Sequence, residues 1–284
     1  MHDVLEDMRI DLELRGLRDN TVQTYLRYAG KFIDGVGKPL EEVNRDDVRQ
    51  YLLGLKDAGV RPPTRNMHLT AIQTLFSSTL QRPEVTAGIR RARVQHKVPV
   101  VLSGSEVDQL LKGIRSVTHR AMVATLYGAG LRVSEMCRLR IADVDSKRMR
   151  LRIVEGKSHQ RYARLTPRTL QALRRYFRIR HPRGPYLFPG RSGNQPITRV
   201  SVAKALAKVA RELGLRKRVY PHALRHSFAV HLLDLGADLR TVQLLLGHHR
   251  ITSTAHYLHL SQAQLRRAPS PLDTLGTSRA RPLG

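Results

Sequence analysis

Residues 221–236 read PHALRHSFAVHLLDLG, and residues 237–247 continue ADLRTVQLLLG. Glycine often ends a helix, because it adopts the left-handed C-cap conformation without strain. The pattern therefore predicts one helix over His222–Leu235, closed by Gly236, and a second over Asp238–Leu246, closed by Gly247. Histidine and arginine side chains lie along this segment, so it also carries groups that could perform chemistry.

The rest of the chain after about residue 102 predicts more helix and one small sheet. Ser103 and Glu106 form a capping box at the start of a helix. Two short alternating runs at residues 150–154 and 161–165, joined by residues 155–160, predict a β-hairpin. Other helices are expected through Met122–Tyr127, ended by Gly128, and behind the N-cap residues Thr166 and Thr198. This part is expected to be a mixed α/β domain, mostly helix.

The first ninety residues predict a separate all-helical domain. Apolar residues recur at three- and four-residue steps in four segments, as on the buried face of an amphipathic helix. Asp19, Asn20 and Thr21 precede one of these segments and are good N-caps. The four helices are expected at about residues 4–14, 21–33, 46–55 and 64–76. The whole chain is therefore mainly α with a small β-sheet.

Charge also divides the chain. Its 284 residues hold 50 lysines and arginines against 23 aspartates and glutamates, a formal net charge of +27. Residues 1–93 carry 15 basic and 13 acidic side chains, a net charge of +2, whereas residues 94–284 carry 35 and 10, a net charge of +25. We expect a helical domain at 1–93, a basic linker at 94–101, a second domain at 102–262 and a tail at 263–284. Nucleic acid is the commonest partner of so basic a chain.

Several other classes of protein are excluded. No stretch is long and apolar enough to span a bilayer, so a cytoplasmic, nucleoid-associated protein is expected. One cysteine, Cys137, excludes an intrachain disulfide and a thiolate metal cluster. Seven of the 13 histidines fall between His222 and His259, but no glutamate lies among them as it does beside a catalytic zinc pair. A zinc site is therefore the weaker alternative to structural histidines.

A set of cations, imidazoles and one phenol stands at the expected ends of elements. Such a pocket, without paired carboxylates, suits phosphoryl chemistry in which protein groups replace metal ions. Taken singly, each member has an ordinary explanation as a DNA-facing cation or a packing side chain. The set comprises Arg132, Lys157, His222, Arg225, His248 and Tyr257.

At these residues the chain resembles the tyrosine recombinases, also called phage integrases, and in particular their Xer-like branch. The motifs are GLRVSEM at residues 130–136, PHALRHSFAVHLL at 221–233, LLGH at 245–248, and Tyr257 nine residues after His248. The four-helix segment resembles the family's core-binding domain, so the likeness covers essentially the whole chain. One departure is Gln160, which stands before Arg161 at a position that is commonly basic in relatives.

The resemblance implies a catalytic role for each residue. Tyr257 would attack a DNA phosphodiester, leaving a 3′-phosphotyrosyl bond and a free 5′-hydroxyl. Arg132 and Arg225 would bind the non-bridging oxygens, where charge builds in the transition state. Lys157 would protonate the departing 5′-oxygen, and His222 would take or relay the tyrosine proton.

The remaining roles concern support. His248 would donate a hydrogen bond to the phosphate, while His226 and His231 would serve structure. Glu135 would orient the basic groups, the alternative being an ordinary glutamate on a helix face.

The resemblance further implies a partner and an assembly. The partner would be double-stranded DNA with inverted half-sites, bound by a homotetramer or together with a related recombinase. No ATP, metal or other cofactor is implied, because the covalent bond conserves the energy of the cleaved phosphodiester. Base readout would come from the first domain, around Arg27, Lys31, Arg65 and Asn66. The tail at 263–284 would either dock on a neighbouring protomer or be a disordered end.

Two other functions are consistent with the strongly positive net charge of the chain. A type IB topoisomerase would share the catalytic set, but the Xer-like motifs and the N-terminal domain argue against it. A non-catalytic DNA-binding protein would need no phenol in the pocket, so the complete set from Arg132 to Tyr257 argues against that function. Chromosome dimer resolution, phage integration and transposon movement all remain open as the biological role.

Overall fold

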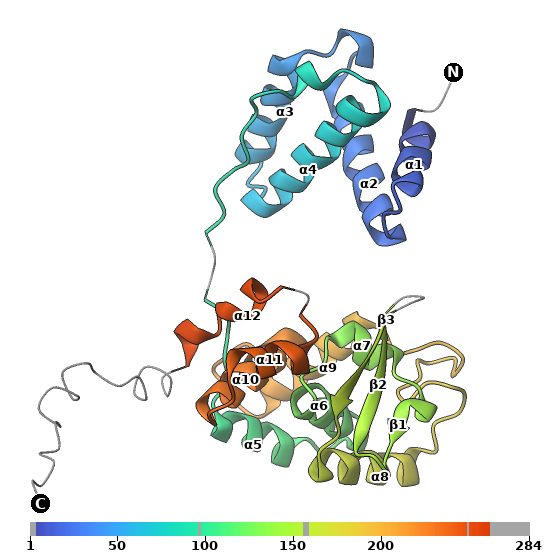
Figure 1. Ribbon diagram of the computed structural model, residues 1–284, viewed down its shortest axis with the longest axis vertical. Helices are drawn as coiled ribbons and strands as arrows, with labels where there is room; N and C mark the ends of the chain where they lie inside the picture. Colours follow the sequence, from blue (N-terminus) through green and yellow to red (C-terminus); the bar gives the residue numbers. More distant parts are fainter. Residues whose placement is uncertain (1–3, 96–97, 156–158, 249, 262–284) are drawn as a thin grey trace, which may run out of the picture. The chain divides into compact units, whose positions relative to one another are not determined.

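The computed structural model describes residues 4–95, 98–155, 159–248 and 250–261 (Figure 1). The chain folds as two compact units, Met1–Lys97 and Val98–Gly284. Helices predominate in both, and the described residues of the second unit hold one three-stranded sheet. The predicted fold class, mainly α with a small β-sheet, is therefore confirmed. No helix in the described ranges is long and apolar enough to cross a membrane.

The described residues of the first unit form four α-helices, as predicted. They pack around an apolar core in which Phe32 contacts the rings of Tyr51 and Phe76 edge to face, with ring centroids 5.1 and 6.0 Å apart. The last helix continues into a short π-helical turn at Leu75–Thr79. The helices are α1 (Val4–Leu14), α2 (Asp19–Val36), α3 (Arg45–Asp57) and α4 (Pro62–Thr74).

The caps of this unit differ in part from the prediction. Helix α2 begins at Asp19, so Asp19 lies in the first turn, where its charge favours the helix dipole, and no side chain caps the end. Helix α3 is capped by Asn44, whose side chain accepts hydrogen bonds from the backbone N–H groups of Asp46 and Asp47. The Asp47 carboxylate closes the capping box by accepting from the Asn44 N–H at 2.7 Å.

The second unit contains the helices predicted from its capping residues and glycines. Ser103 and Glu106 form the expected box, and Thr166, Thr198 and Asp238 each cap a helix. The short helix α7 carries Cys137, which is buried in it, and the short helix α12 was not predicted. The helices are α5 (Gly104–Gly113), α6 (Val117–Gly128), α7 (Val133–Arg138), α8 (Pro167–Arg180), α9 (Arg199–Glu212), α10 (Pro221–Asp234), α11 (Leu239–Leu246) and α12 (Thr252–Ala255).

The predicted hairpin forms the greater part of the sheet. Strand β2 (Arg150–Glu155) pairs antiparallel with β3 (His159–Arg164), and the short β1 (Val144–Asp145) pairs with β2. Ile153 and Leu151 are buried on the inner face, opposite Arg161 and Ala163 respectively. Directly opposed residues share a face, so Arg161 lies in the inward register. Strand β1 was missed because two residues cannot show an alternation.

Helix α10 is anchored in the interior by a polar side chain. It packs against α6 and α11 (Figure 1), and Ser227 on its inner face is fully buried. The backbone N–H of Leu102 donates to the Ser227 hydroxyl at 2.8 Å, and that hydroxyl donates to the Ala223 carbonyl at 2.7 Å. The segment leading into α5 is thereby tied to the helix that carries Arg225.

We predict that Ser227→Ala destabilises the second unit. The substitution leaves the buried Leu102 N–H without an acceptor, which costs on the order of 1–3 kcal/mol of unfolding free energy. Urea denaturation of the full chain, followed by circular dichroism, measures the loss. Ser146→Ala, in the exposed turn before β2, is the matched control. Equal stability of the two variants would show that the Ser227 hydrogen bonds contribute nothing.

Candidate active site

The second unit brings most of the predicted catalytic residues together where α10 and α11 meet α7 and the segment after α12. Arg132 precedes α7, Arg225 lies in α10, His248 follows α11, and Tyr257 follows α12. In Figure 1, α10, α11 and α12 lie side by side, and α11 also contacts β3. Lys157 lies outside the residues that the structure describes.

Glu135 occupies the centre of this cluster. It is only 6% exposed and accepts hydrogen bonds from the backbone N–H of Arg132 at 2.7 Å and from the Arg132 Nη1 at 2.9 Å. Nη2 of Arg161 donates to both carboxylate oxygens, at 3.0 and 2.9 Å. Nη1 of Arg225 lies 3.8 Å from Oε2. Three guanidinium groups therefore gather at one buried carboxylate, and a role of Glu135 in orienting them for catalysis stays a prediction.

The same three arginines bind consecutive carbonyl groups at the end of α11. Arg161 donates to the carbonyl of Leu245 at 3.1 Å, and Arg225 donates to that of Leu246 at 2.7 Å. Arg132 donates to the carbonyl of Gly247 at 3.2 Å. The last carbonyls of a helix lack partners within it and carry its partial negative charge. The arginines satisfy these carbonyls and so fix the backbone immediately before His248.

Arg225 is the most deeply placed of the three. It is 3% exposed, and its Nη1 also donates to the Gly130 carbonyl at 2.7 Å. Burial, followed by the charge of Arg132, lowers the pKa of Arg225 to about 10. The group is therefore still charged at neutral pH. Three guanidiniums around one carboxylate leave an excess of positive charge, which suits a polyanionic ligand.

Tyr257 is buried beside this cluster. It is 2% exposed and packs among apolar residues of α10 and α11, including Leu233 and Leu246. Its hydroxyl lies 2.9 Å from Nδ1 of His226, and its ring is stacked on that of His248, with centroids 6.5 Å apart. The pKa of the phenol is raised, because the effect of burial exceeds the opposite effect of the Arg225 and Arg132 charges.

The histidines around Tyr257 are neutral at pH 7. Burial lowers the pKa of His226 to about 4, with further contributions from His222 and His256. Burial lowers the pKa of His248 to about 4 as well, helped by Arg225 and Arg132. Nδ1 of His248 lies 2.8 Å from the Thr254 hydroxyl, which fixes its ring.

The structure places His226, and not His222, at the phenol. His222 is exposed, and its ring centroid lies 6.3 Å from that of His226. Shielding of part of its ring by the protein, followed by the charges of Arg225 and Arg132, lowers the pKa of His222. Sequence reasoning assigned His226 to structure alone, although the spacing of four residues from His222 already placed both rings on one helix face.

The predicted base-reading residues occupy α2 and α4 of the first unit. Arg27 and Lys31 are exposed one turn apart on α2, and Arg27 covers the ring of Tyr28 at 4.7 Å. Asn66 on α4 donates through Nδ2 to the Ala92 carbonyl at 2.9 Å and accepts the Ala92 N–H at 2.8 Å. Its amide therefore holds the segment after the last helix, and base readout by these residues stays a prediction.

Arg65 lies next to that amide. Together with Asn66 it lines a hollow of about 280 Å³ whose other cations are Arg49 and Arg90. The Nε atom of Arg65 is buried and has no hydrogen-bond partner among the described residues.

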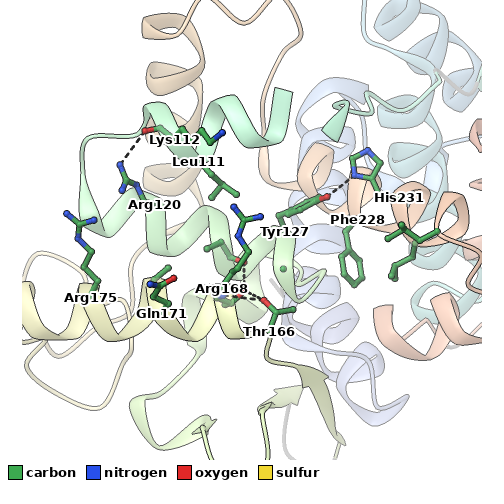
Figure 2. A pocket seen from close by; sticks show the side chains of 16 residues that line it. Leu111, Lys112, Arg120, Tyr127, Thr166, Arg168, Gln171, Arg175, Phe228 and His231 are labelled. Atoms are coloured by element: carbon green, nitrogen blue, oxygen red, sulfur yellow. Dashed lines mark hydrogen bonds between the residues drawn. The ribbon is translucent and has the colours of Figure 1, made fainter. Parts of the chain in front are cut away.

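A second hollow in the second unit is separate from the predicted site (Figure 2). It has a volume of about 500 Å³, lies between α5, α6, α8 and α10, and includes none of the predicted catalytic residues. His231 closes one side, with its Nδ1 2.8 Å from the Tyr127 hydroxyl. Four cations are among the other residues that line it: Lys112, Arg120, Arg168 and Arg175.

The described residues offer no group of three or more histidine, cysteine, aspartate or glutamate side chains that could hold a metal ion. At the start of α10, the ring of His226 instead lies 6.3 Å from that of His222 and contacts Tyr257. The arrangement that the structure does provide is a cluster of cations beside a buried phenol, which suits transfer of a phosphoryl group to that phenol.

Comparison with known proteins gives two family matches and several full-length relatives. Residues 100–264 match the phage integrase family, and residues 4–84 match the N-terminal SAM-like domain of phage integrases. A Sinorhizobium fredii protein assigned provisionally as an integrase/recombinase is 39% identical over 271 residues, covering 94% of this chain and 88% of that protein. Tyrosine recombinase XerD of Oceanobacillus iheyensis is 32% identical over 94% of this chain and 95% of its own length.

Solved structures share the fold. The Tn1549 transposon integrase in complex with transposon right end DNA matches with a TM-score of 0.74 at 21% identity, covering 95% of this chain and 96% of that one. The XerA recombinase matches with a TM-score of 0.56 at 24% identity, covering 98% of both chains. The two-part architecture described above is therefore shared with these proteins.

We predict that acid destabilises the protein through the partly buried histidines His226 and His248. The pKa values of His226 and His248 are about 4 in the folded chain, against about 6.5 for a histidine exposed on unfolding. Between these values the unfolded chain binds more protons, so the stability present above pH 6.5 is lost as the pH falls toward 4. Thermal unfolding measured at intervals from pH 7 to pH 5 gives the slope.

His226→Gln should flatten that slope, because one of the low-pKa groups is removed. His259→Gln, at an exposed histidine after Tyr257, is the control and should leave the slope unchanged. A wild-type slope in the His226 variant would contradict the prediction.

Proposed function

The chain belongs to the phage integrase family of tyrosine recombinases and is a site-specific DNA recombinase, and we propose that it works through a 3′-phosphotyrosyl intermediate on Tyr257. The observation that carries this proposal is that Arg132 and Arg225 gather at one buried carboxylate and that both lie close enough to Tyr257 for their charges to lower its pKa, although the three residues come from separate segments. The cations supply the charge that a phosphate requires, and the phenol supplies the nucleophile.

In the proposed reaction, the oxygen of Tyr257 attacks the phosphorus and the 5′-oxygen of the next nucleotide leaves. Arg132 and Arg225 bind the non-bridging oxygens, on which negative charge accumulates. His248, beside the phenol ring, donates a hydrogen bond to the same phosphate. In the second half of the reaction, a 5′-hydroxyl attacks the phosphotyrosyl bond and regenerates the phenol. Because the bond energy is conserved, the proposal requires neither ATP nor a metal ion.

The tyrosine proton needs an acceptor. His226 is in hydrogen-bond contact with the hydroxyl, and its low pKa makes it a neutral ring at pH 7. His222, expected from the resemblance to take or relay this proton, lies on the exposed side of His226. We assign the first contact to His226 and the onward relay toward solvent to His222. Lys157, which comes between β2 and β3 in the sequence, is assigned to protonate the leaving 5′-oxygen.

DNA is the proposed partner of both units. Residues 94–284, which comprise the second unit and the four residues before it, supply most of the positive charge for the phosphate backbone, since their net charge is +25. The first unit supplies the base-reading side chains, and the basic segment 94–101 links the two. Exchange of strands at paired inverted half-sites requires four active sites, so we propose a tetramer assembled on DNA, with each tail at 263–284 docked on a neighbour. A protein with this task belongs in the cytoplasm, on the nucleoid.

Replacement of Tyr257 by Phe should abolish the covalent adduct and leave DNA affinity nearly intact. One hydroxyl carries the chemistry, while many phosphate contacts carry the affinity. The substrate is a nicked duplex bearing the site that the full-length protein selects from a random-sequence pool. Adduct is measured by denaturing gel electrophoresis, and affinity by titration at fixed salt.

Tyr162→Phe, at an exposed tyrosine of β3, is the matched control and should form adduct at the wild-type rate. EDTA should leave the wild-type rate unchanged. Adduct in the Tyr257 variant would assign the nucleophile elsewhere, and loss of activity in EDTA restored by a divalent metal would overturn the metal-free mechanism.

Lys157→Ala should slow cleavage of an ordinary phosphodiester far more than cleavage of a substrate with a 5′-bridging sulfur. Sulfur leaves without needing a proton, so only the oxygen substrate depends on a general acid. The ratio of the two single-turnover rates is the measurement. Lys147→Ala, which removes the same charge from the turn before β2, should leave that ratio unchanged. Equal slowing of both substrates by Lys157→Ala would reject Lys157 as the acid.

A further inference from the structure

Arg161 is a charged residue at an inward-facing position of a strand. It stands opposite Ile153, on the same face of β3 as the buried Ala163, and its side chain is only 18% exposed. Inward positions of strands normally hold apolar side chains, because burying a charge without partners is costly. The groups that contact Arg161 must therefore compensate for the cost of burying its charge.

Those partners are the groups that hold the proposed phosphate-binding site together. Nη2 of Arg161 contacts both oxygens of Glu135, at 3.0 and 2.9 Å, and Nη1 donates to the Leu245 carbonyl at 3.1 Å. Arg161 thus connects β3 to α7 on one side and to the end of α11 on the other. Its Nε is buried, without a hydrogen-bond partner among the described residues.

The backbone at the end of α11 is shaped to let this side chain pass. Gly247 has a left-handed φ of 65°, and a Cβ placed there would lie 2.4 Å from Nε and 2.6 Å from Cδ of Arg161. Real Cβ atoms do not approach other atoms so closely. Glycine at position 247 therefore meets two requirements. It adopts the left-handed conformation that ends α11, and it leaves room for the Arg161 side chain.

Glu135 would hold the other two arginines differently if Arg161 were absent. A buried carboxylate must be compensated by its neighbours. Without Arg161, the remaining cations are Arg132, already bound, and Arg225, whose Nη1 lies 3.8 Å away. Both guanidiniums would then be drawn further onto the carboxylate and away from an incoming phosphate. The end of α11, which precedes His248, would also lose one of its three arginine caps.

We propose that Arg161 is a positioning residue for strand cleavage, which holds Glu135 and the end of α11 so that Arg132, Arg225 and His248 meet the scissile phosphate in the correct geometry. The proposal rests on the proposed function of this site. Arg161 acts through these residues, since its two Nη atoms are engaged by the carboxylate and the Leu245 carbonyl. A misplacement of catalytic groups by about 1 Å can lower a rate on the order of 10²-fold.

The test compares three variants in the full-length protein. Arg161→Gln removes the charge and the fork, whereas Arg161→Lys keeps the charge but cannot bridge the carboxylate and the carbonyl in the same geometry. Arg164→Gln removes the same charge from the exposed face of the same strand. Adduct formation is measured in single-turnover experiments with protein saturating the selected nicked duplex, so that affinity does not enter the rate.

Arg161→Gln should lower the saturated rate on the order of 10²-fold, while its DNA affinity matches that of Arg164→Gln. Arg161→Lys should fall between the wild type and Arg161→Gln, with wild-type affinity. A folded Arg161→Gln variant that cleaves as fast as Arg164→Gln would overturn the proposal. A wild-type rate in Arg161→Lys would also overturn it, and that variant supplies the test if Arg161→Gln does not fold.

A second readout is independent of DNA. The groups that lower the pKa of His248 by charge are Arg225, Arg132, His256 and Arg161. Removing the charge in Arg161→Gln should therefore raise the His248 pKa above its value in the wild type and in Arg164→Gln, and Arg161→Lys should hold it near the wild-type value. NMR titration of the histidine ring protons measures this value. An unchanged His248 pKa in Arg161→Gln would show that the charge of Arg161 does not act on His248.

Failure of this inference is distinguishable from failure of the proposed function. If the proposed function fails, the wild-type protein forms no adduct, or Tyr257→Phe still does. If only the inference fails, the wild type forms an adduct through Tyr257 and Arg161→Gln does so equally fast.

Discussion

The site depends on a single buried carboxylate. Glu135 contacts Arg132 and Arg161 directly and lies 3.8 Å from Arg225, and the same arginines bind the last carbonyls of α11. Burying any one of these charges alone would be costly, so each is stable only because the others are in place. The loop before α7, the hairpin strand β3 and helices α10 and α11 are therefore held in one arrangement by electrostatics as well as by apolar packing. Loss of a single member affects several elements at once.

Burial of the phenol places a second constraint on the chemistry. The interior that fixes the ring of Tyr257 between His226 and His248 also raises its pKa, and the arginine charges offset this only in part. A neutral phenol is a weak nucleophile, so deprotonation has to accompany attack on the phosphate. The neutral His226 ring at 2.9 Å is positioned to accept that proton. In the proposed reaction, the packing that raises the pKa of the phenol also places it beside the group that would take its proton.

Local signals predicted most of the fold, and the catalytic roles assigned from the resemblance stay predictions. Glycines and capping residues fixed the ends of α10 and α11, and the Ser103 capping box was correct, because these features depend on neighbours in sequence. The network around Glu135 could not be derived in this way, since Arg161 reaches it from 26 residues away. One signal was available but unused: an arginine in the same strand register as Ala163 and Leu165. The contact of His226 with Tyr257 likewise depends on how α10 meets the segment after α12.

Groups of the protein itself compensate for the excess positive charge of the site. Three guanidiniums around one carboxylate leave two positive charges in a poorly hydrated region, and the carbonyl groups at the negative end of α11 compensate for them. Arg225 is held by two carbonyls at 2.7 Å each and is nearly inaccessible, so it has little freedom to move. The Arg132 side chain is 29% exposed and has a longer bond of 3.2 Å to the Gly247 carbonyl. We infer that Arg225 provides the fixed half of the proposed phosphate site. Arg132 would exchange its hydrogen bond to the Gly247 carbonyl for one to the incoming phosphate oxygen, at a small cost in free energy.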